Sequence, residues 1–184
     1  MLWTMLRPEE RDNRKVVEHV RQSQDDVWRI ARWFSDKGYE VRIPPTSYSK
    51  NYQDRLNHID QGDLYVKFQR EERVEVKGLS AQFTSKDDWP MGNTAIVCAK
   101  HSFDNAYPKP FFYLLLSADK VHAMFIRSDT KEHWEVREYT DKRYKSMRQR
   151  FYVCPIQYIK FGNIQSASEL RGWDAYPRYA HRAG

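Results

Sequence analysis

Two acidic side chains and one lysine are spaced along a short stretch of this sequence so that they could act together on a phosphate. Residues 62–68 and 73–78 each alternate apolar and polar residues, which predicts two half-buried strands. Side chains two apart in a strand point to the same face, so Asp63, Glu75 and Lys77 fall opposite the apolar positions. Carboxylates bind divalent cations, and a lysine stabilises developing negative charge. The spacing therefore predicts a metal-dependent phosphodiesterase site on the non-core face of a hairpin.

The same residues resemble the signature of a nuclease superfamily. Asp63, followed after eleven residues by Glu75-x-Lys77, is similar to the motif of the PD-(D/E)xK nucleases, which have the restriction-endonuclease-like fold. Residues 36–41 (Asp-Lys-Gly-Tyr-Glu-Val) resemble the end of the first helix and the following strand in archaeal-type Holliday-junction resolvases. The resemblance covers residues 16–100, although glycine precedes the aspartate where many members have proline.

The resemblance implies a magnesium-dependent DNA endonuclease, in which manganese would substitute for magnesium. Asp63 and Glu75 would bind the metal, and the backbone carbonyl of Val76 would be a further ligand. Such an ion lowers the pKa of a bound water and neutralises charge on the scissile phosphate. Lys77 would assist the attacking water by positioning it and stabilising charge.

Many members of the superfamily carry another acid on the first helix. Glu18, Asp25 and Asp26 are the candidates, and the spacing from Gly38 makes Asp26 the nearest match. Asp26 lies on the flank of an apolar helical stripe that includes Ile30, from which it could lean toward the metal. An ordinary solvated aspartate is the alternative interpretation.

An ordinary solvated sheet face is the alternative interpretation of the whole motif. The chain is 30% charged, so acid-x-Lys pairs are expected by chance, and Asp129-x-Lys131 is one in a polar run typical of a turn. Glu75-x-Lys77 differs because valines interleave it and an aspartate opens the preceding strand. Cross-strand Lys and Glu pairs nevertheless also occur on exposed sheets.

Charge favours an anionic partner. The 184-residue chain fits one domain and carries 31 Lys and Arg against 25 Asp and Glu, a net charge of +6. Since acidic residues balance most of the Lys and Arg residues, the clustering of the basic residues says more about an anionic partner than their total number. Five basic residues lie within nine positions and are expected to contact DNA phosphates: Lys142, Arg143, Lys145, Arg148 and Arg150. Tyr144 or Tyr152 could stack on a base. A merely solubilising stretch is the alternative.

The cysteines and the hydropathy pattern favour a cytoplasmic protein, associated with the nucleoid when bound to DNA. Cys98 and Cys154 lie in apolar runs and are expected to be reduced core residues. Cys98-x-x-His101 has no second pair, which argues against a zinc site. No segment approaches the ~18 apolar residues of a membrane span, and Met1–Leu6 is too short for a secretory signal.

The elements that must position the site follow from the same patterns. A helical stripe covers residues 16–37, and a long polar loop at 46–61 delivers Asp63. Alternating or continuous apolar runs predict the remaining strands, at residues 39–43, 94–99, 111–116, 121–126 and 134–139. The family plan requires a crossover helix after Gly78, but residues 79–94 favour at most a short, weak helix.

We therefore predict an α/β fold: a restriction-endonuclease-like mixed sheet flanked by helices, with extra C-terminal strands. The predicted domain spans residues 16–164, between an arm at 1–15 and a tail at 165–184. A homodimer would suit double-strand or junction cutting. Two rival functions remain open at this stage: a non-catalytic nucleic-acid-binding protein on the same scaffold, and a protein-interaction module.

Overall fold

The computed structural model describes residues 23–45, 62–141 and 147–165, and it shows a mixed α/β fold rich in strands. The strands are β1 (Glu40–Arg42), β2 (Leu64–Lys67), β3 (Glu71–Gly78), β4 (Thr94–Ala99), β5 (Phe112–Leu116), β6 (His122–Arg127), β7 (Glu135–Asp141), β8 (Met147–Pro155) and β9 (Ile159–Asn163). They form a six-stranded sheet, in the order β1-β2-β3-β5-β6-β9, and a three-stranded sheet, in the order β4-β8-β7.

The six-stranded sheet begins with an antiparallel meander and then contains one parallel pair. β1, β2 and β3 pair antiparallel, β3 pairs parallel with β5, and β5, β6 and β9 are again antiparallel. The predicted strands at 39–43 and 62–68 and the hairpin at 111–126 are confirmed. β3 begins at Glu71, two residues before the alternating segment, so the turn from β2 is shorter than expected.

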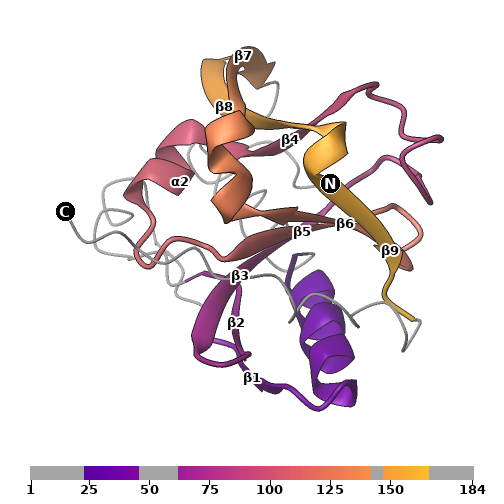
Figure 1. The fold of residues 1–184 in the computed structure, drawn as a ribbon, viewed down its shortest axis with the longest axis vertical. Coiled ribbons are helices and arrows are strands. Elements are labelled where there is room, and N and C mark those ends of the chain that lie inside the picture. The colour runs from indigo at the N-terminus through magenta and orange to yellow at the C-terminus, as the bar shows by residue number, and fades with distance from the viewer. Residues whose placement is uncertain (1–22, 46–61, 142–146, 166–184) are drawn as a thin grey trace, which may run out of the picture.

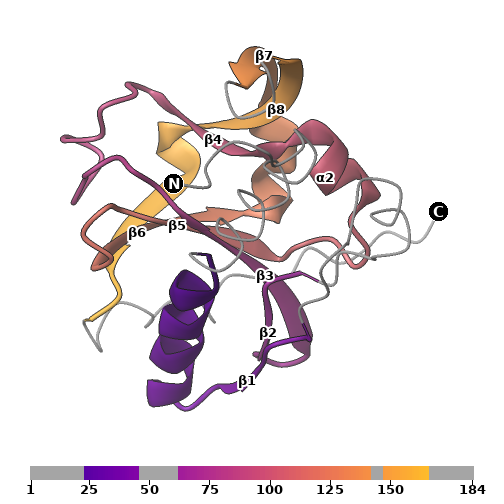
Figure 2. The ribbon, with the colours of Figure 1, turned by 180° about the vertical axis from the view of Figure 1, so that it is seen from behind.

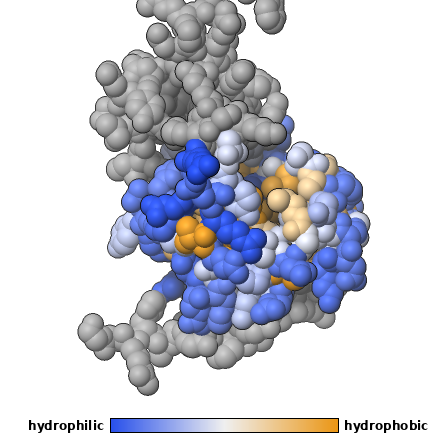
Figure 3. Space-filling model, turned by 90° about the horizontal axis from the view of Figure 1, so that it is seen from above, coloured by the Kyte–Doolittle hydropathy of each residue, from blue (hydrophilic) through white to orange (hydrophobic). Residues whose placement is uncertain are grey.

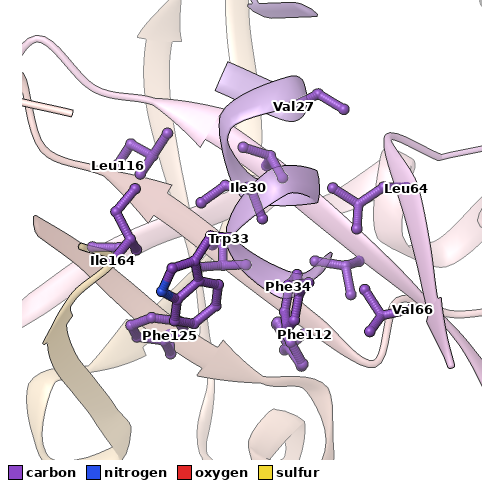
Figure 4. Packing of buried hydrophobic residues seen from close by; sticks show 14 residues of the cluster. Val27, Ile30, Trp33, Phe34, Leu64, Val66, Phe112, Leu116, Phe125 and Ile164 are labelled. Carbon is purple, nitrogen blue, oxygen red and sulfur yellow. The ribbon is translucent and has the colours of Figure 1, made fainter. Parts of the chain in front are cut away.

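A helix over residues 23–36 covers one face of this sheet, which we call the helix face (Figures 1 and 2). Its stripe of Val27, Ile30 and Phe34 packs on the sheet together with Trp33 (Figure 4). Gly38 ends the helix with φ +87°, a left-handed conformation that glycine adopts without strain. Trp33, which lies off the predicted stripe, is buried in this core, whereas Trp28 is exposed.

The opposite face of the sheet is also covered. We call it the charged face, because β3 presents Arg73, Glu75 and Lys77 on it. A second apolar cluster lies between the two sheets and includes Tyr113 and Leu115 of the large sheet. Val97 and Cys154 contribute to it from the three-stranded sheet. The expectation that Glu75 and Lys77 lie on a non-core face is therefore wrong, because β4 and β8 close over that face.

The crossover between β3 and its parallel neighbour β5 passes through the second layer. Residues 79–93 form turns without a helix, and the helix of the crossover is α2 (Lys100–Asn105), which follows β4 directly. Only Phe103 of α2 is buried, so its six residues carry no helical apolar period that the sequence could reveal. A crossover therefore joins the parallel strands β3 and β5, but its helix lies later in the chain than the predicted residues 79–94.

The C-terminal half supplies the covering layer. Residues 128–133, predicted as a turn, form a 3-10 helix between β6 and β7. Cys98 and Cys154 are buried and reduced as predicted, and burial raises the pKa of both thiols, that of Cys154 to about 12. Among the residues that the structure describes, no helix is long and apolar enough to cross a membrane.

Candidate functional site

Strand register brings the predicted site residues together. Leu64 on β2 lies opposite Val74 on β3, and the ladder ends with this pair; continuing its antiparallel register by one position would bring Asp63 opposite Glu75. Residues that face each other in an antiparallel pair have side chains on the same face, and so do residues two apart in one strand. Glu75 and Lys77 therefore share the charged face, as the alternation predicted, and Asp63 would join them if the register continued beyond Leu64.

Asp63 is fixed to β3 by its own carboxylate. It precedes the first residue of β2, so the backbone ladder between the two strands ends before it. The Val76 backbone N–H donates a 2.7 Å hydrogen bond to Asp63 Oδ2, which extends the pairing by a side chain. This bond holds the aspartate against the strand that carries Glu75 and Lys77.

Glu75 is held by a residue that the sequence interpretation missed. Arg73 Nε donates to Glu75 Oε1 at 2.6 Å, and the Arg73 side chain is only 1% exposed, against 15% for Glu75. Arginine is almost never fully buried unless it is paired. In the sequence, Arg73 is one more polar residue of an alternating strand, so nothing there distinguishes it from a solvated cation. Arg73 is distinguished only by its burial, which arises in the folded structure when β4 and β8 cover this face.

Lys77 connects the two sheets. Its Nζ donates to the backbone carbonyl of Val97 on β4 at 2.6 Å and lies 5.5 Å from the centre of the Tyr113 ring. The ammonium is consequently half-buried beside Glu75 rather than extended into water. These two contacts fix the orientation of the Lys77 side chain.

Two ionisable groups in the cluster between the sheets, Tyr113 and Cys98, lie in surroundings that disfavour charge. Burial raises the pKa of the Tyr113 hydroxyl, and the neighbouring Cys98 and Glu75 raise it further. Burial also raises the pKa of the Cys98 thiol, an effect that the Tyr113 hydrogen bond and the Lys77 ammonium partly oppose. Electrostatic interactions are stronger in such surroundings than in bulk water, so the charges of Glu75 and Lys77 act more strongly than exposed ones.

Asp26, the candidate acid of the first helix, lies elsewhere. It is buried on the helix face, where Lys120 Nζ donates to its Oδ2 at 2.8 Å. Its carboxylate lies so close to Gly78 that a Cβ on that glycine would be 2.1 Å from Oδ2. Asp25 is exposed, and Glu18 lies outside the described residues. Within the described ranges, no three His, Cys, Asp or Glu side chains form a group that could hold a metal.

The donors of Asp63 and Glu75 nevertheless fit magnesium chemically. Magnesium prefers oxygen ligands, keeps several waters and is commonly held by one or two carboxylates. One oxygen of each carboxylate accepts a hydrogen bond, from Val76 and from Arg73 respectively. A carboxylate has two oxygens and about four lone-pair sites, so one group can accept a hydrogen bond and bind a metal ion at the same time. Two half-buried carboxylates on one face are thus a suitable, though small, protein donor set.

The predicted DNA-contacting residues are described only in part. Lys142, Arg143, Lys145 and Tyr144 lie outside the described residues. Arg148 and Arg150 are exposed on β8, where Arg148 forms a 3.2 Å ion pair with Glu138. The prediction that Tyr152 could stack on a base is wrong. It is 5% exposed, and its hydroxyl donates to Asp104.

Geometry alone defines this candidate site. Glu75 and Lys77 lie with Arg73 on one face of β3, Asp63 is bonded to the same strand through the Val76 N–H, and Asp26 lies on the opposite face. No family model, no curated protein and no solved structure matches the chain.

Proposed function

We propose that this protein is a metal-dependent endodeoxyribonuclease that hydrolyses DNA phosphodiester bonds by in-line attack. The observation that carries the proposal is the hydrogen bond from the Val76 N–H to Asp63 Oδ2, which ties the aspartate to the strand that bears Glu75 and Lys77. A motif that was merely a coincidence of sequence would not be expected to converge in this way. The half-burial of these groups also argues against an ordinary solvated face.

The connectivity supports a restriction-endonuclease-like arrangement as part of this proposal. A helix precedes three antiparallel strands, and a crossover then leads to a strand parallel to the third. This is the order in which the superfamily places its first helix, its aspartate, its Glu-x-Lys strand and the next strand. β6, β7, β8 and β9 would be the extra C-terminal strands, and β4, which lies in the crossover, pairs with β8.

Each residue has a distinct role in the proposed reaction. Asp63 and Glu75 would hold Mg²⁺ or Mn²⁺, with the Val76 carbonyl as a further ligand. The bound ion would supply an activated water and neutralise charge on the scissile phosphate. The Lys77 ammonium, already oriented by the Val97 carbonyl, would bind the phosphate and stabilise the charge that develops on it.

The proposed partner is DNA. The net charge of +6 favours an anionic ligand. Arg148 and Arg150 are exposed cations on β8 that could contact phosphates. The surface seen in Figure 3 is mostly hydrophilic, with hydrophobic residues confined to small areas, which suits a charged partner. A homodimer would allow both strands of a duplex or a junction to be cut.

A non-catalytic nucleic-acid-binding protein on the same scaffold is the second candidate. Its specific support is the Arg73 guanidinium, which already gives Glu75 a positive partner. If that ion pair excludes a metal, the site would be silent. Such a protein would bind DNA in a salt-sensitive and metal-independent way, without cleaving it.

Cleavage of supercoiled plasmid and of a branched DNA by purified protein separates these candidates. The reactions would contain Mg²⁺, Mn²⁺ or EDTA, with the Lys77→Ala protein assayed in parallel. Nicking that requires metal and disappears in Lys77→Ala supports the nuclease. DNA that is retarded on a gel but never cut supports the silent scaffold. DNA that is neither cut nor bound refutes both.

A further inference from the structure

Arg73 is the most deeply buried charged side chain of the charged face, and its environment is unusual for a cation. Its side chain is 1% exposed, and its Nε donates to Glu75 Oε1 at 2.6 Å. Removing an ion pair from water costs free energy that the pairing itself often fails to recover. Stability alone is therefore a weak reason for placing an arginine here.

Gly62 makes room for this arginine. A Cβ at position 62 would lie 2.5 Å from Arg73 Nε and 3.0 Å from its Cγ and Cδ. Gly62 also has φ +81°, a conformation that other residues rarely adopt. The Arg73 side chain therefore lies against Gly62, the residue before Asp63, and its Nε also donates to Glu75. One guanidinium side chain contacts the chain segment of one candidate ligand and the carboxylate of the other.

We propose that Arg73 is a positioning residue, which fixes Glu75 and the Gly62–Asp63 segment in the arrangement that binds a divalent metal. This inference rests on the proposed function. Arg73 would act through Glu75 and Asp63, without contacting the substrate. Groups that orient metal ligands typically change metal affinity 10–100-fold when they are removed. Arg73 is therefore expected to strengthen metal binding rather than to compete with it.

A second Arg–Glu pair on the same sheet provides a matched control. Arg42 on β1 donates two hydrogen bonds to Glu71 on β3, at 2.8 and 2.7 Å. Both side chains of this pair are about half exposed, whereas Arg73 is enclosed. Replacing Arg42 removes the same charge from the same sheet at a position away from Asp63 and Glu75. Any general effect of charge on metal affinity should appear in both variants.

The test is a calorimetric titration of Mn²⁺ into wild-type, Arg73→Met, Arg73→Lys and Arg42→Met proteins, below the unfolding temperature of each. We expect Arg73→Met to bind Mn²⁺ 10–100-fold more weakly and Arg42→Met to bind like the wild type. Arg73→Lys retains the charge without the planar Nε donor, so it should also bind more weakly. If Arg73→Met does not fold, Arg73→Lys provides the same comparison. In plasmid cleavage, the Arg73 variants should lose kcat while the KM for DNA stays unchanged.

The outcomes distinguish this inference from the function on which it rests. Folded Arg73 variants that bind Mn²⁺ as tightly as the wild type, or more tightly, overturn the positioning role while leaving the nuclease intact. Equal weakening in Arg42→Met also overturns it, since the effect would then be one of overall charge. A wild-type protein that neither binds Mn²⁺ nor cleaves DNA refutes the proposed function itself.

Discussion

The two faces of the six-stranded sheet are both covered, but they are built differently. The helix face is filled mainly by apolar side chains such as Phe34, Leu64 and Val66, all fully buried (Figure 4), and its buried carboxylate, Asp26, is paired with Lys120. The charged face places Arg73, Glu75 and Lys77 beside an equally apolar cluster. A core needs only hydrophobic packing, and buried charges add a desolvation cost. Under the proposed function, substitutions on the helix face should change mainly stability and substitutions on the charged face mainly activity.

The largest expected effect is on the helix face. Phe34 is fully buried and packs against the rings of Tyr39, Phe68 and Phe112. Phe34→Ala should lower the free energy of unfolding by about 3–5 kcal/mol, because it removes buried surface and leaves a cavity. Urea unfolding followed by circular dichroism measures this change. Cleavage per folded molecule should remain at the wild-type level, and a selective loss of cleavage would contradict the division between the faces.

On the charged face the effect should be on activity instead. Lys77→Met keeps an apolar stem beside Tyr113 but removes the ammonium. Cleavage should fall at least ~100-fold, about 2.7 kcal/mol of transition-state stabilisation. The free energy of unfolding should fall by only about 1–2 kcal/mol, through the lost bond to Val97. Lys67→Met, which breaks an exposed pair with Glu40, is the control and should retain activity.

Asp26 tests whether the helix face contributes to the site at all. Asp26→Ala leaves Lys120 without its carboxylate partner, so it should destabilise the fold by about 1–3 kcal/mol. Because Asp26 lies across the sheet from Glu75, cleavage by the folded variant should be unchanged. Thermal unfolding and plasmid nicking on the same preparation provide both numbers. Loss of nicking at full folding would make Asp26 a member of the site after all.

The smallest expected effect concerns the turn that leads from β3 to the covering sheet. Hydrogen bonds from Ser85 and Thr84 lower the pKa of Asp88 from 3.8 to about 2. A lowered pKa contributes stability that is fully present above pH 3.8 and is lost as the pH falls through about 2. Asp88→Ala should therefore slightly lower the unfolding temperature at pH 6, and the difference from wild type should shrink toward pH 2. A difference independent of pH would contradict this assignment.

The sequence predicts well those features that depend on local pattern. Alternation identifies β2 and β3, and a continuous apolar run identifies β5, because each strand faces a core on at least one side. The same alternation places Glu75 and Lys77 on one face of β3, since the side-chain period of a strand is fixed.

Features that depend on distant parts of the chain are not predicted. Whether the charged face is solvated depends on β4 pairing with β8, strands separated by about fifty positions. Until that pairing is known, Arg73 cannot be told from an exposed cation. The sequence does not predict α2, because a helix of six residues with one buried side chain has no apolar periodicity. The basic composition predicts a surface stretch that includes Arg148 and Arg150, but it does not predict that they lie in a strand, because that depends on the pairing of β8 with β7.

Counting bound Mn²⁺ by electron paramagnetic resonance tests the central difference between the two faces most directly. The samples would be wild-type, Asp63→Asn, Glu75→Gln and Asp26→Asn proteins, each verified as folded. We expect one Mn²⁺ per wild-type chain, strongly weakened binding in the two charged-face variants and full binding in Asp26→Asn. Absence of bound Mn²⁺ in the wild type, or binding that survives both charged-face substitutions, would contradict the assignment of the metal site to this face.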